Sequence, residues 1–406
     1  LQAIGATQAL STLNINTAAT STANISLPNI GDAGNDGVDG ATNIGNSNTN
    51  LLTISGTIYK TGGATDYEAK SGNTILLTGA SPTITTGGAD LSFSTGNIVL
   101  STAGTTTFTT GSGSAGGITV DGTIDGTNGE NEALALESGS GAIQLQGTIG
   151  GTNPVTTIAI NSTNGSAGTI EIVGIGDSNT TGASSTATIG NTSTGTLTLD
   201  GTIYKTGGDQ TYVASATGND SGQNIDITGA ATFTTTNDAV AFNTSGVDLA
   251  NNGTTTINTG TGAGDVTFAG ALETNGGSND LLVITSGAGD VTFTGAVGAT
   301  NALGGLDVNS SAGDGDITFS STIGDSGNAG VVGTTAIGGT ATEDVNLAGL
   351  IYKFDGGTTI TAADGDNIKL TGTGNVTFTT AADAIEFATG HIHLANGSNL
   401  VVDTGS

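Results

Sequence analysis

Three aspartates recur at regular spacing in the second half of the chain. Asp265, Asp290 and Asp316 each follow a glycine and precede a Val/Ile-Thr-Phe string, at steps of about 25 and 26 residues. If each string is a strand on one turn of a coiled chain, the three carboxylates align on one edge and repel one another. Ca²⁺ takes about six to eight oxygen ligands, and glycine-rich turns offer carbonyl oxygens. Plain solvated surface acids are the favoured interpretation, and Ca²⁺ bound at these three aspartates is the alternative and the one cofactor that the sequence suggests.

Two other sets of polar residues have a spacing that bears on function. His391 and His393 lie at i and i+2 on one side of an expected strand, but the chain has only two histidines, so a solvated strand face is the favoured interpretation over a metal pair. Thr267, Thr292 and Thr318 recur at the same step and would form a flat outward array, as on ice-binding solenoids. Thr is also simply a good strand former.

The charge balance excludes several classes of partner. The net charge is −30, from 35 acids and five lysines, and the chain has no arginine and no cysteine. Because a nucleic-acid interface needs a basic patch, we predict no nucleic-acid partner. The acidic surface would be repelled by anionic lipid, and no apolar run approaches the ~18 residues of a membrane helix, so we predict no membrane insertion. The absence of cysteine excludes a disulfide framework.

A short repeat determines the expected fold class. Runs of four to six alternating residues are separated throughout by Gly, Asn, Asp and Ser turns, and only three prolines occur. A step of about 25 residues suits a rung of two or three short strands, so the sequence predicts an all-β protein that forms a parallel β-solenoid (β-helix). Period-2 geometry would put the valine and phenylalanine of each string inside and stack Phe268, Phe293 and Phe319 on consecutive rungs. The alternative is a row of β-sandwich beads of about 145 residues, which should show linkers and large core aromatics.

A long repeat is superimposed on the short one. The string Ile-Tyr-Lys occurs at Tyr59, Tyr204 and Tyr352, at spacings of about 145 and 148 residues, which we interpret as six rungs. We therefore treat residues 1–406 as one continuous solenoid segment. Residues 1–58 end one long repeat, 59–203 and 204–351 are full copies, and 352–406 start the next. Three phenylalanines share one long-repeat position and are expected in the core: Phe93, Phe242 and Phe387.

The expected partner follows from the ends and from the lysines. The chain begins and ends inside a repeat, so we expect a segment of a longer array whose end strands pair with more of the same polypeptide or with another copy. Lys60, Lys205 and Lys353 occupy one repeat position, where they could meet carboxylates of a neighbouring copy. Self-association, or continuation of the same polypeptide, is therefore the predicted interaction. For the Tyr-Lys pairs themselves, solvated pairs at strand ends are the favoured interpretation.

Strings such as residues 289–298, Gly-Asp-Val-Thr-Phe-Thr-Gly-Ala-Val-Gly, resemble the β-strand repeats of giant bacterial surface proteins. That group includes filamentous-haemagglutinin-like and autotransporter-type adhesins. The resemblance covers the whole chain and implies a parallel β-solenoid, secretion and a role at the cell surface. The rung of about 25 residues is longer than is usual for haemagglutinin-type repeats.

The expected function is structural or adhesive. Pectin-cleaving enzymes resemble this chain in architecture, but they rely on clustered carboxylates with a catalytic Arg or Lys. Here the acids are mostly scattered singly in turns, where Asp is common, so we predict no enzyme and no catalytic residue. We expect an extracellular rod, fibre or sheath at the cell surface. The alternative is a solenoid face that binds glycans or ice.

Overall fold

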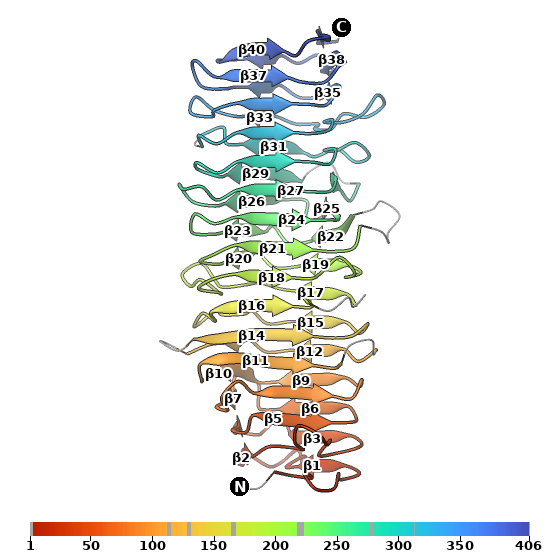
Figure 1. Cartoon of the computed structure of the whole chain (residues 1–406), viewed down its shortest axis with the longest axis vertical. Helices are drawn as coiled ribbons and strands as arrows, with labels where there is room; N and C mark the ends of the chain where they lie inside the picture. Colours follow the sequence, from red (N-terminus) through yellow and green to blue (C-terminus); the bar gives the residue numbers. More distant parts are fainter. Residues whose placement is uncertain are drawn as a thin grey trace. The chain divides into compact units, whose positions relative to one another are not determined.

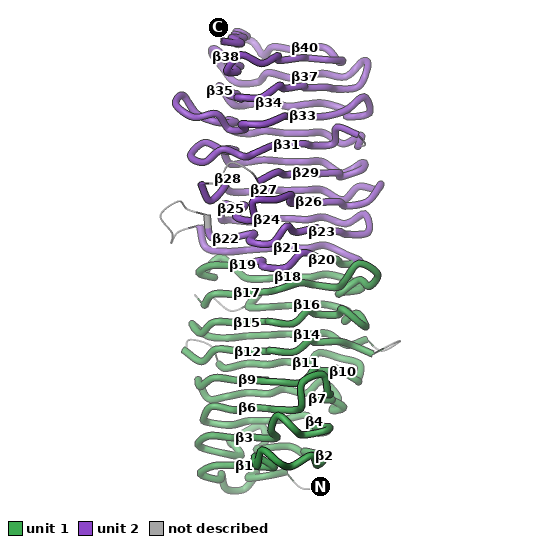
Figure 2. The backbone as a smooth tube through the Cα atoms, turned by 180° about the vertical axis from the view of Figure 1, so that it is seen from behind, with its two compact units in different colours: residues 1–198, 203–206 green, residues 199–202, 207–406 purple. Residues whose placement is uncertain are grey.

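The structure is a computed structural model of the 406-residue chain, and it describes residues 3–111, 115–127, 131–163, 168–216, 223–276, 280–311 and 313–405. These residues contain strands and turns but no helix. They form two compact units, residues 1–198 with 203–206 and residues 199–202 with 207–406 (Figure 2). Each unit is a parallel β-solenoid with rungs about 26 residues apart, as the sequence predicted.

The first unit has three columns of parallel strands, one strand of each column per rung (Figure 1). The first column contains β5 (Ile58–Thr61), β8 (Thr83–Thr86), β11 (Gly104–Thr109), β14 (Glu132–Glu137), β16 (Thr157–Ile160) and β18 (Ala187–Ile189). The second contains β1 (Leu13–Ile15), β3 (Thr42–Gly45), β6 (Thr65–Glu68), β9 (Leu91–Thr95), β12 (Ile118–Val120), β15 (Ile143–Leu145) and β17 (Ile170–Ile172). The third contains β2 (Asn24–Leu27), β4 (Leu51–Ile54), β7 (Thr74–Leu77), β10 (Asn97–Leu100) and β13 (Ile124–Asp125), and single bridges at Ile149 and Ile175 continue it to β20 (Ile203–Lys205). The strand β19 (Leu197–Leu199) includes residues of both units.

The second unit repeats the three-column plan. One column contains β21 (Gln210–Val213), β24 (Val240–Asn243), β27 (Val266–Phe268), β30 (Val291–Phe293), β32 (Ile317–Phe319), β34 (Val345–Leu347), β37 (Asn367–Leu370) and β40 (His391–Leu394). Another contains β22 (Gln223–Ile227), β25 (Gly246–Leu249) and β28 (Leu272–Thr274), and single bridges at Val297 and Ile323 continue it to β35 (Ile351–Lys353), β38 (Gly374–Thr379) and β41 (Ser398–Asp403). The last contains β23 (Thr232–Thr234), β26 (Thr254–Asn258), β29 (Leu281–Thr285), β31 (Gly305–Val308), β33 (Thr335–Ile337), β36 (Thr358–Ile360) and β39 (Ile385–Phe387).

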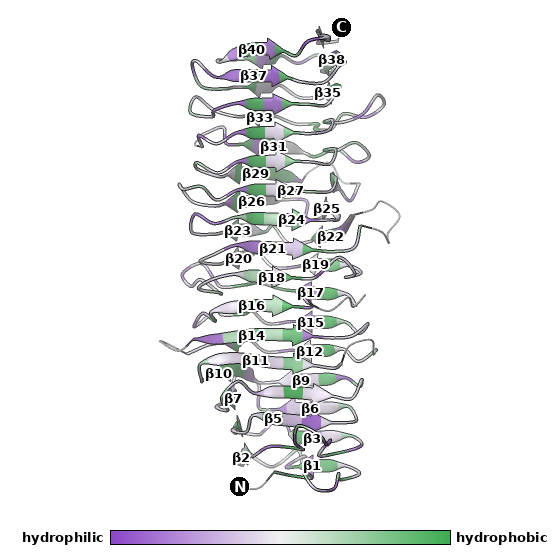
Figure 3. Ribbon diagram, in the orientation of Figure 1, coloured by the Kyte–Doolittle hydropathy of each residue, from purple (hydrophilic) through white to green (hydrophobic). Residues whose placement is uncertain are grey.

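The alternation of apolar and polar residues places one face of each strand inside. In β27 the side chains of Val266 and Phe268 are buried, whereas Thr267 between them is partly exposed. Figure 3 shows the same mixture of hydrophobic and hydrophilic residues along many strands. Successive side chains of a strand point to opposite faces, so a strand of three residues contributes two core side chains. The core of each rung is therefore thin, and it consists mainly of Ile, Leu and Val side chains together with buried Phe and Tyr rings.

Aromatic side chains stack along the interior of the second unit. Phe268 pairs in register with Phe293, and Phe293 with Phe319. The ring centroids are 5.1 and 4.6 Å apart, and the planes are 5° and 8° from parallel. Parallel stacking at this separation follows from the strand spacing of about 4.8 Å, because each ring repeats on the next rung. The predicted register of the solenoid is confirmed.

The phenylalanines of the long repeat are not equivalent in the structure. Phe93 and Phe242 are fully buried, as predicted, but Phe387 is only half-buried. Phe387 lies in β39, the last strand of its column in the described part of the chain, so the core covers it from one side. Phe242 and Phe387 also lie in different columns of the same unit, β24 and β39.

The long repeat therefore does not span a whole number of rungs. In the first unit, Tyr59 lies in the β5 column, but Tyr204 bridges Ile175 in another column. Counting three positions per turn, the two tyrosines are 17 strand positions apart, which is five and two-thirds turns. Val247 in β25 and Ile392 in β40, also one long repeat apart, are separated by the same 17 positions in the second unit. The expectation of six rungs was wrong by one strand position, and each copy is turned by a third of a turn about the axis of its unit.

Candidate functional site: a repeated lysine loop

The three predicted aspartates align on one edge of the second unit. The Oδ1 atom of Asp265 accepts a hydrogen bond from the backbone N–H of Asp290 at 2.9 Å, and Oδ1 of Asp290 accepts one from the N–H of Asp316 at 2.9 Å. Asp316 in turn accepts from the N–H of Asp344 at 2.9 Å. We call these four residues the aspartate ladder. Each carboxylate thus binds a backbone amide of the next rung, which offsets the repulsion between like charges at strand spacing.

Asp344, the last member of the ladder, was not predicted from the sequence. Asp344 accepts hydrogen bonds from the backbone N–H of Asn367 at 2.9 Å and from the Lys369 ammonium. Burial raises the pKa of the Asp344 carboxyl, but the bonds from Lys369 and Asn367 outweigh it and hold this pKa below its usual range. The ladder therefore ends on one of the five lysines of the chain.

No ion-binding geometry is evident at the ladder. Among the residues that the structure describes, no group of three or more His, Cys, Asp or Glu side chains is arranged to hold a metal ion. The Ca²⁺ site at Asp265, Asp290 and Asp316 stays a prediction. His391 and His393 are both exposed on β40, opposite Asn367 and Lys369 of β37.

The outward threonines also align as expected. Thr267, Thr292 and Thr318 pair in register on consecutive rungs and are partly exposed. The row is short, because Ala241 precedes Thr267 and Asn346 follows Thr318.

A more elaborate repeated feature surrounds Lys60, Lys205 and Lys353. Each lysine lies on a strand beside a loop of the preceding rung, and these loops, residues 31–37, 176–182 and 324–330, share the pattern Gly-Asp-x-x-x-x-Gly. The backbone N–H of the last loop glycine donates to the lysine carbonyl at 2.8 Å in all three copies. We call each loop, together with its lysine, a lysine loop.

The aspartate of each lysine loop folds the loop from within. Oδ1 of Asp32 accepts from the backbone N–H groups of Gly34 and Asn35, both at 2.8 Å, and Asp325 accepts in the same way from Gly327 and Asn328. These backbone bonds are the main reason why the pKa of each of the two carboxyls lies below its usual range. The arrangement is the local turn that Asp side chains favour.

The pattern requires glycine at both ends of the loop. Gly324 has a φ of +72°, which strains any other L residue. A Cβ on Gly330 would lie 2.3 Å from the backbone nitrogen of Gly324, so the two ends of the loop are in contact.

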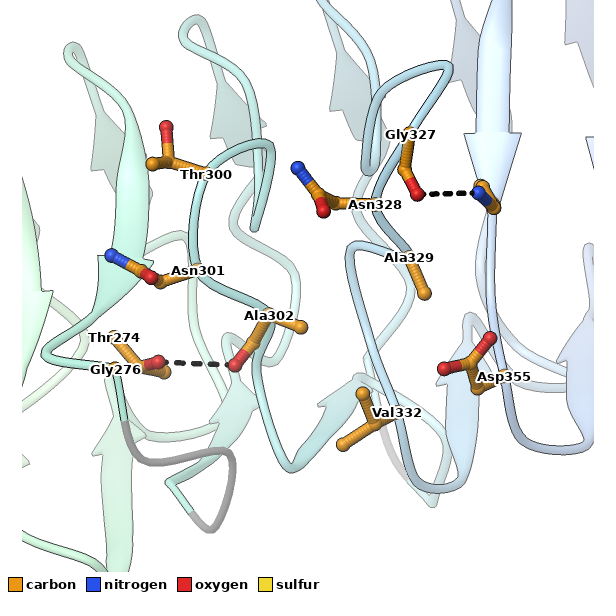
Figure 4. Close-up of a pocket in the computed structure, with 11 residues that line it drawn as sticks. Thr274, Gly276, Thr300, Asn301, Ala302, Gly327, Asn328, Ala329, Val332 and Asp355 are labelled. Atoms are coloured by element: carbon orange, nitrogen blue, oxygen red, sulfur yellow. Dashed lines mark hydrogen bonds between the residues drawn. The ribbon is translucent and has the colours of Figure 1, made fainter.

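Each lysine side chain holds its loop. The ammonium of Lys60 lies 3.3 Å from a carboxylate oxygen of Asp36. The ammonium of Lys205 donates to the carbonyl of Ser178 at 3.4 Å, and that of Lys353 donates to the carbonyl of Gly327 at 3.0 Å (Figure 4). The buried tyrosine before each lysine anchors the strand, since the Tyr59 hydroxyl donates to the carbonyl of Leu27 at 3.0 Å. Burial raises the pKa of Tyr59 to about 12. The Tyr-Lys pairs are therefore bonded within the chain and are not simply solvated strand ends.

Two of the three lysine loops each line a pocket of their own. One pocket, of about 330 Å³, lies beside Asn328, Lys353 and Asp355, with Thr300 and Asn301 of the preceding rung on its other side (Figure 4). The other, of about 310 Å³, lies beside Asn35 and Lys60. These loops were not predicted from the sequence, although their pattern is visible there in the glycine that recurs six residues after the first.

A partly buried acidic column is the other unexpected feature. Asp226, Asp248 and Glu273 pair in register on three consecutive rungs. Burial, together with the charges of Asp226 and Asp280, raises the pKa of Asp248 to about 6. Burial also raises the pKa of Asp226 and Glu273, the latter against backbone hydrogen bonds from residues 299–301. Oδ1 of Asp248 is buried and makes no hydrogen bond among the described residues.

No family model, curated protein or solved structure matches the chain. No helix in the described residues is long and apolar enough to cross a membrane.

Proposed function

We propose that the chain is an extracellular structural or adhesive repeat segment that acts as a stiff rod, fibre or sheath at the cell surface. The observation that carries the proposal is the in-register repetition of strands, aromatic rings and turn carboxylates over consecutive rungs. Backbone ladders and stacked side chains join each rung to its neighbours, and such repeats gain stability from nearest-neighbour contacts. A stiff, regular surface is what a spacer or a sheath needs.

Several features favour a mechanical over a catalytic role. The acids of the ladder and of the lysine loops are engaged in backbone hydrogen bonds, which hold the turns. The resemblance to the β-strand repeats of bacterial surface proteins supports the extracellular location. We propose that the chain is not an enzyme, and that its partners are copies of itself or further parts of the same polypeptide.

Small-angle X-ray scattering of the purified chain tests the proposed rod. Stacked rungs should give an elongated particle whose length grows by about 4.8 Å per rung. A flexible string of beads or a compact globule would contradict the proposal. Sedimentation at rising protein concentration, at low and at high salt, tests self-association, and a chain that stays monomeric throughout would count against it.

The alternative function, a ligand-binding face, gains support from the pockets at the lysine loops. The ice-binding version rests on a threonine row of only three rungs. Of the two ligand classes, the glycan is therefore the one favoured.

A further inference from the structure

We propose that the lysine loops are repeated binding sites for neutral sugar residues, and that the two lysine loops of the first unit face different sides of that unit. The proposal rests on the adhesive role proposed above and names its ligand class. The carrying observation is that pockets of similar size occur at equivalent repeat positions in two separate units.

The correspondence between the two pockets holds residue by residue. Thr7 and Gln8 take the places of Thr300 and Asn301, Asn35 takes the place of Asn328, and the lysines coincide. The middle copy has Thr152, Asn153, Thr180 and Lys205 at these positions. Each of the three lysine loops thus has a hydroxyl, an amide and an ammonium group around it. In the middle copy the amide comes from Asn153, and the loop itself contributes the hydroxyl of Thr180 where the other copies have an asparagine.

The polar groups of the pockets match the chemistry of a sugar. The side chains of Thr300 and Asn301 make no hydrogen bond among the described residues, so their hydroxyl and amide groups are available to a ligand. An amide offers both donors and an acceptor, as a sugar hydroxyl does. Figure 4 shows Asn328 between the loop of Thr300 and Asn301 and the loop of Gly327 and Ala329. Asp355 lies on the other side of the loop of residues 327–329. The pocket therefore presents hydrogen-bonding groups from three consecutive rungs.

The charges favour a neutral ligand over an acidic one. Each pocket has one ammonium and at least one carboxylate, Lys353 with Asp355 and Lys60 with Asp36. The chain as a whole carries −30, so it repels polyanions at long range. Neither pocket is lined by an aromatic ring, which excludes stacking of a planar ligand.

The rotation of the long repeat determines how the sites are displayed. Lys60 and Lys205 are five and two-thirds turns apart in the first unit, so their loops lie at different sides of that unit. At a strand spacing of about 4.8 Å, this corresponds to roughly 27 Å along its axis. One chain can then engage several sugar chains from different sides. Weak single sites would gain from multivalency, because a second contact within one complex is effectively intramolecular.

The test uses a printed panel of neutral gluco-, manno- and galacto-oligosaccharides, with uronic-acid oligosaccharides beside them. The full chain is compared with the triple variant Lys60→Gln, Lys205→Gln, Lys353→Gln and with the double variant Thr300→Ala, Asn301→Ala. Thr292→Ala, which alters an outward threonine that lines neither pocket, is the matched control. Circular dichroism and the melting temperature establish that each variant is folded.

We expect the chain to bind neutral oligosaccharides, the triple variant to bind at least about tenfold more weakly, and the control to bind as the unaltered chain does. The double variant should bind with an intermediate affinity, since it alters one pocket. Absence of binding to the neutral spots, a preference for the acidic spots, or unchanged binding by a folded triple variant would overturn the proposal. A third outcome is that the unaltered chain self-associates, that the triple variant is monomeric, and that neither of them binds sugar. In that case the pockets are contacts between copies, and the sugar proposal is wrong. Small-angle scattering from the same sample separates the proposed rod from the proposed sugar sites. A rod-shaped particle that binds no sugar would refute only the sugar sites.

Discussion

Carboxylates take two opposite roles in this chain, according to whether hydrogen bonds from the backbone or burial has the larger effect on their pKa. In the aspartate ladder and the lysine loops, N–H groups bind the charged oxygen. In the acidic column, Asp248 lies between Asp226 and Glu273 and has a buried oxygen that accepts no hydrogen bond from the residues that the structure describes. The first arrangement favours the ionised carboxylate, and the second favours the protonated acid.

The acidic column should make stability depend on pH. Because the folded state raises the pKa of Asp248 to about 6, it binds this proton more tightly than the unfolded chain does. The protonated Asp248 therefore stabilises the folded state. Its contribution to the free energy of unfolding is greatest below about pH 4 and is lost as the pH rises through about 6. Asp248→Asn should remove this slope and, at pH 7.5, raise the free energy of unfolding by roughly 1–2 kcal/mol, since solvent screens a partly exposed carboxylate.

Urea unfolding of the unaltered chain and of Asp248→Asn at pH 4.5 and 7.5 measures the difference. Asp314→Asn, at an exposed aspartate of the same unit, is the control and should change neither the midpoint nor its pH dependence by a comparable amount. Equal stabilisation by both variants would indicate a general effect of net charge and not the column.

The aspartate ladder predicts a graded response to substitution. Asp290→Ala removes the acceptor for the N–H of Asp316 and should lower the free energy of unfolding by roughly 0.5–2 kcal/mol. Asp290→Asn keeps an Oδ1 acceptor and should cost less. Chemical denaturation of both variants gives the order. If Asp290→Asn lowers the free energy of unfolding as much as Asp290→Ala does, the stabilisation comes from the charge of Asp290 and not from its hydrogen bond.

Calcium binding at Asp265, Asp290 and Asp316 has a direct thermal test. If Ca²⁺ binds the ladder in the folded state only, millimolar Ca²⁺ should raise the melting temperature, and a chelator should reverse the rise. The effect should fall in the Asp290→Ala variant. An equal rise with NaCl of the same ionic strength would show that salt merely screens the carboxylates.

At the scale of the element, the lysine loop depends on glycine more than on any side chain. Gly330→Ala would place a methyl group 2.3 Å from the nitrogen of Gly324 and 2.7 Å from the carbonyl oxygen of Val297, both backbone atoms. The loop must shift, so we expect a loss of more than about 3 kcal/mol in the free energy of unfolding. Gly357→Ala is the matched control, because nothing lies within 4 Å of its added methyl group. An equal change in melting temperature for the two variants would contradict the close contact between Gly330 and Gly324.

The strands could be predicted from the sequence because their information is local. The alternation in Val266-Thr267-Phe268 specifies which face is buried, and the recurrence of the same string specifies the register of the next rung. The Gly-Asp-x-x-x-x-Gly pattern of the lysine loops is visible in the sequence, but the contact of each loop with its lysine is not. The contact between Lys353 and Gly327 depends on how one rung lies beside the preceding one. The acidic column was missed for the same reason, because Asp226, Asp248 and Glu273 share no sequence string.

At the scale of the whole solenoid, the repeat length carries information that composition does not. A long repeat of six full rungs would present every copy of a loop on one side of a unit. A repeat of five and two-thirds turns, as within each unit here, presents successive copies on different sides. The sequence spacing of about 145 residues was compatible with either. The strand pairing decided between them, because turns between strands vary in length.

The modular construction of the second unit predicts that a rung can be removed without loss of the fold. Deletion of residues 266–290 removes 25 residues and joins Asp265 to Val291, so the string Gly-Asp-Val-Thr-Phe is preserved at the junction. Phe293 then takes the place of Phe268 beside Phe242, and each remaining strand keeps its column. Because rungs contact mainly their neighbours, we expect strand content per residue to be unchanged and the melting temperature to fall by only a few degrees. Deletion of residues 266–278, about half a rung, would instead move every later strand out of its column and should abolish cooperative unfolding. Circular dichroism melts of the two variants distinguish these outcomes, and equal disruption by both deletions would show that this part of the chain is not built from interchangeable rungs.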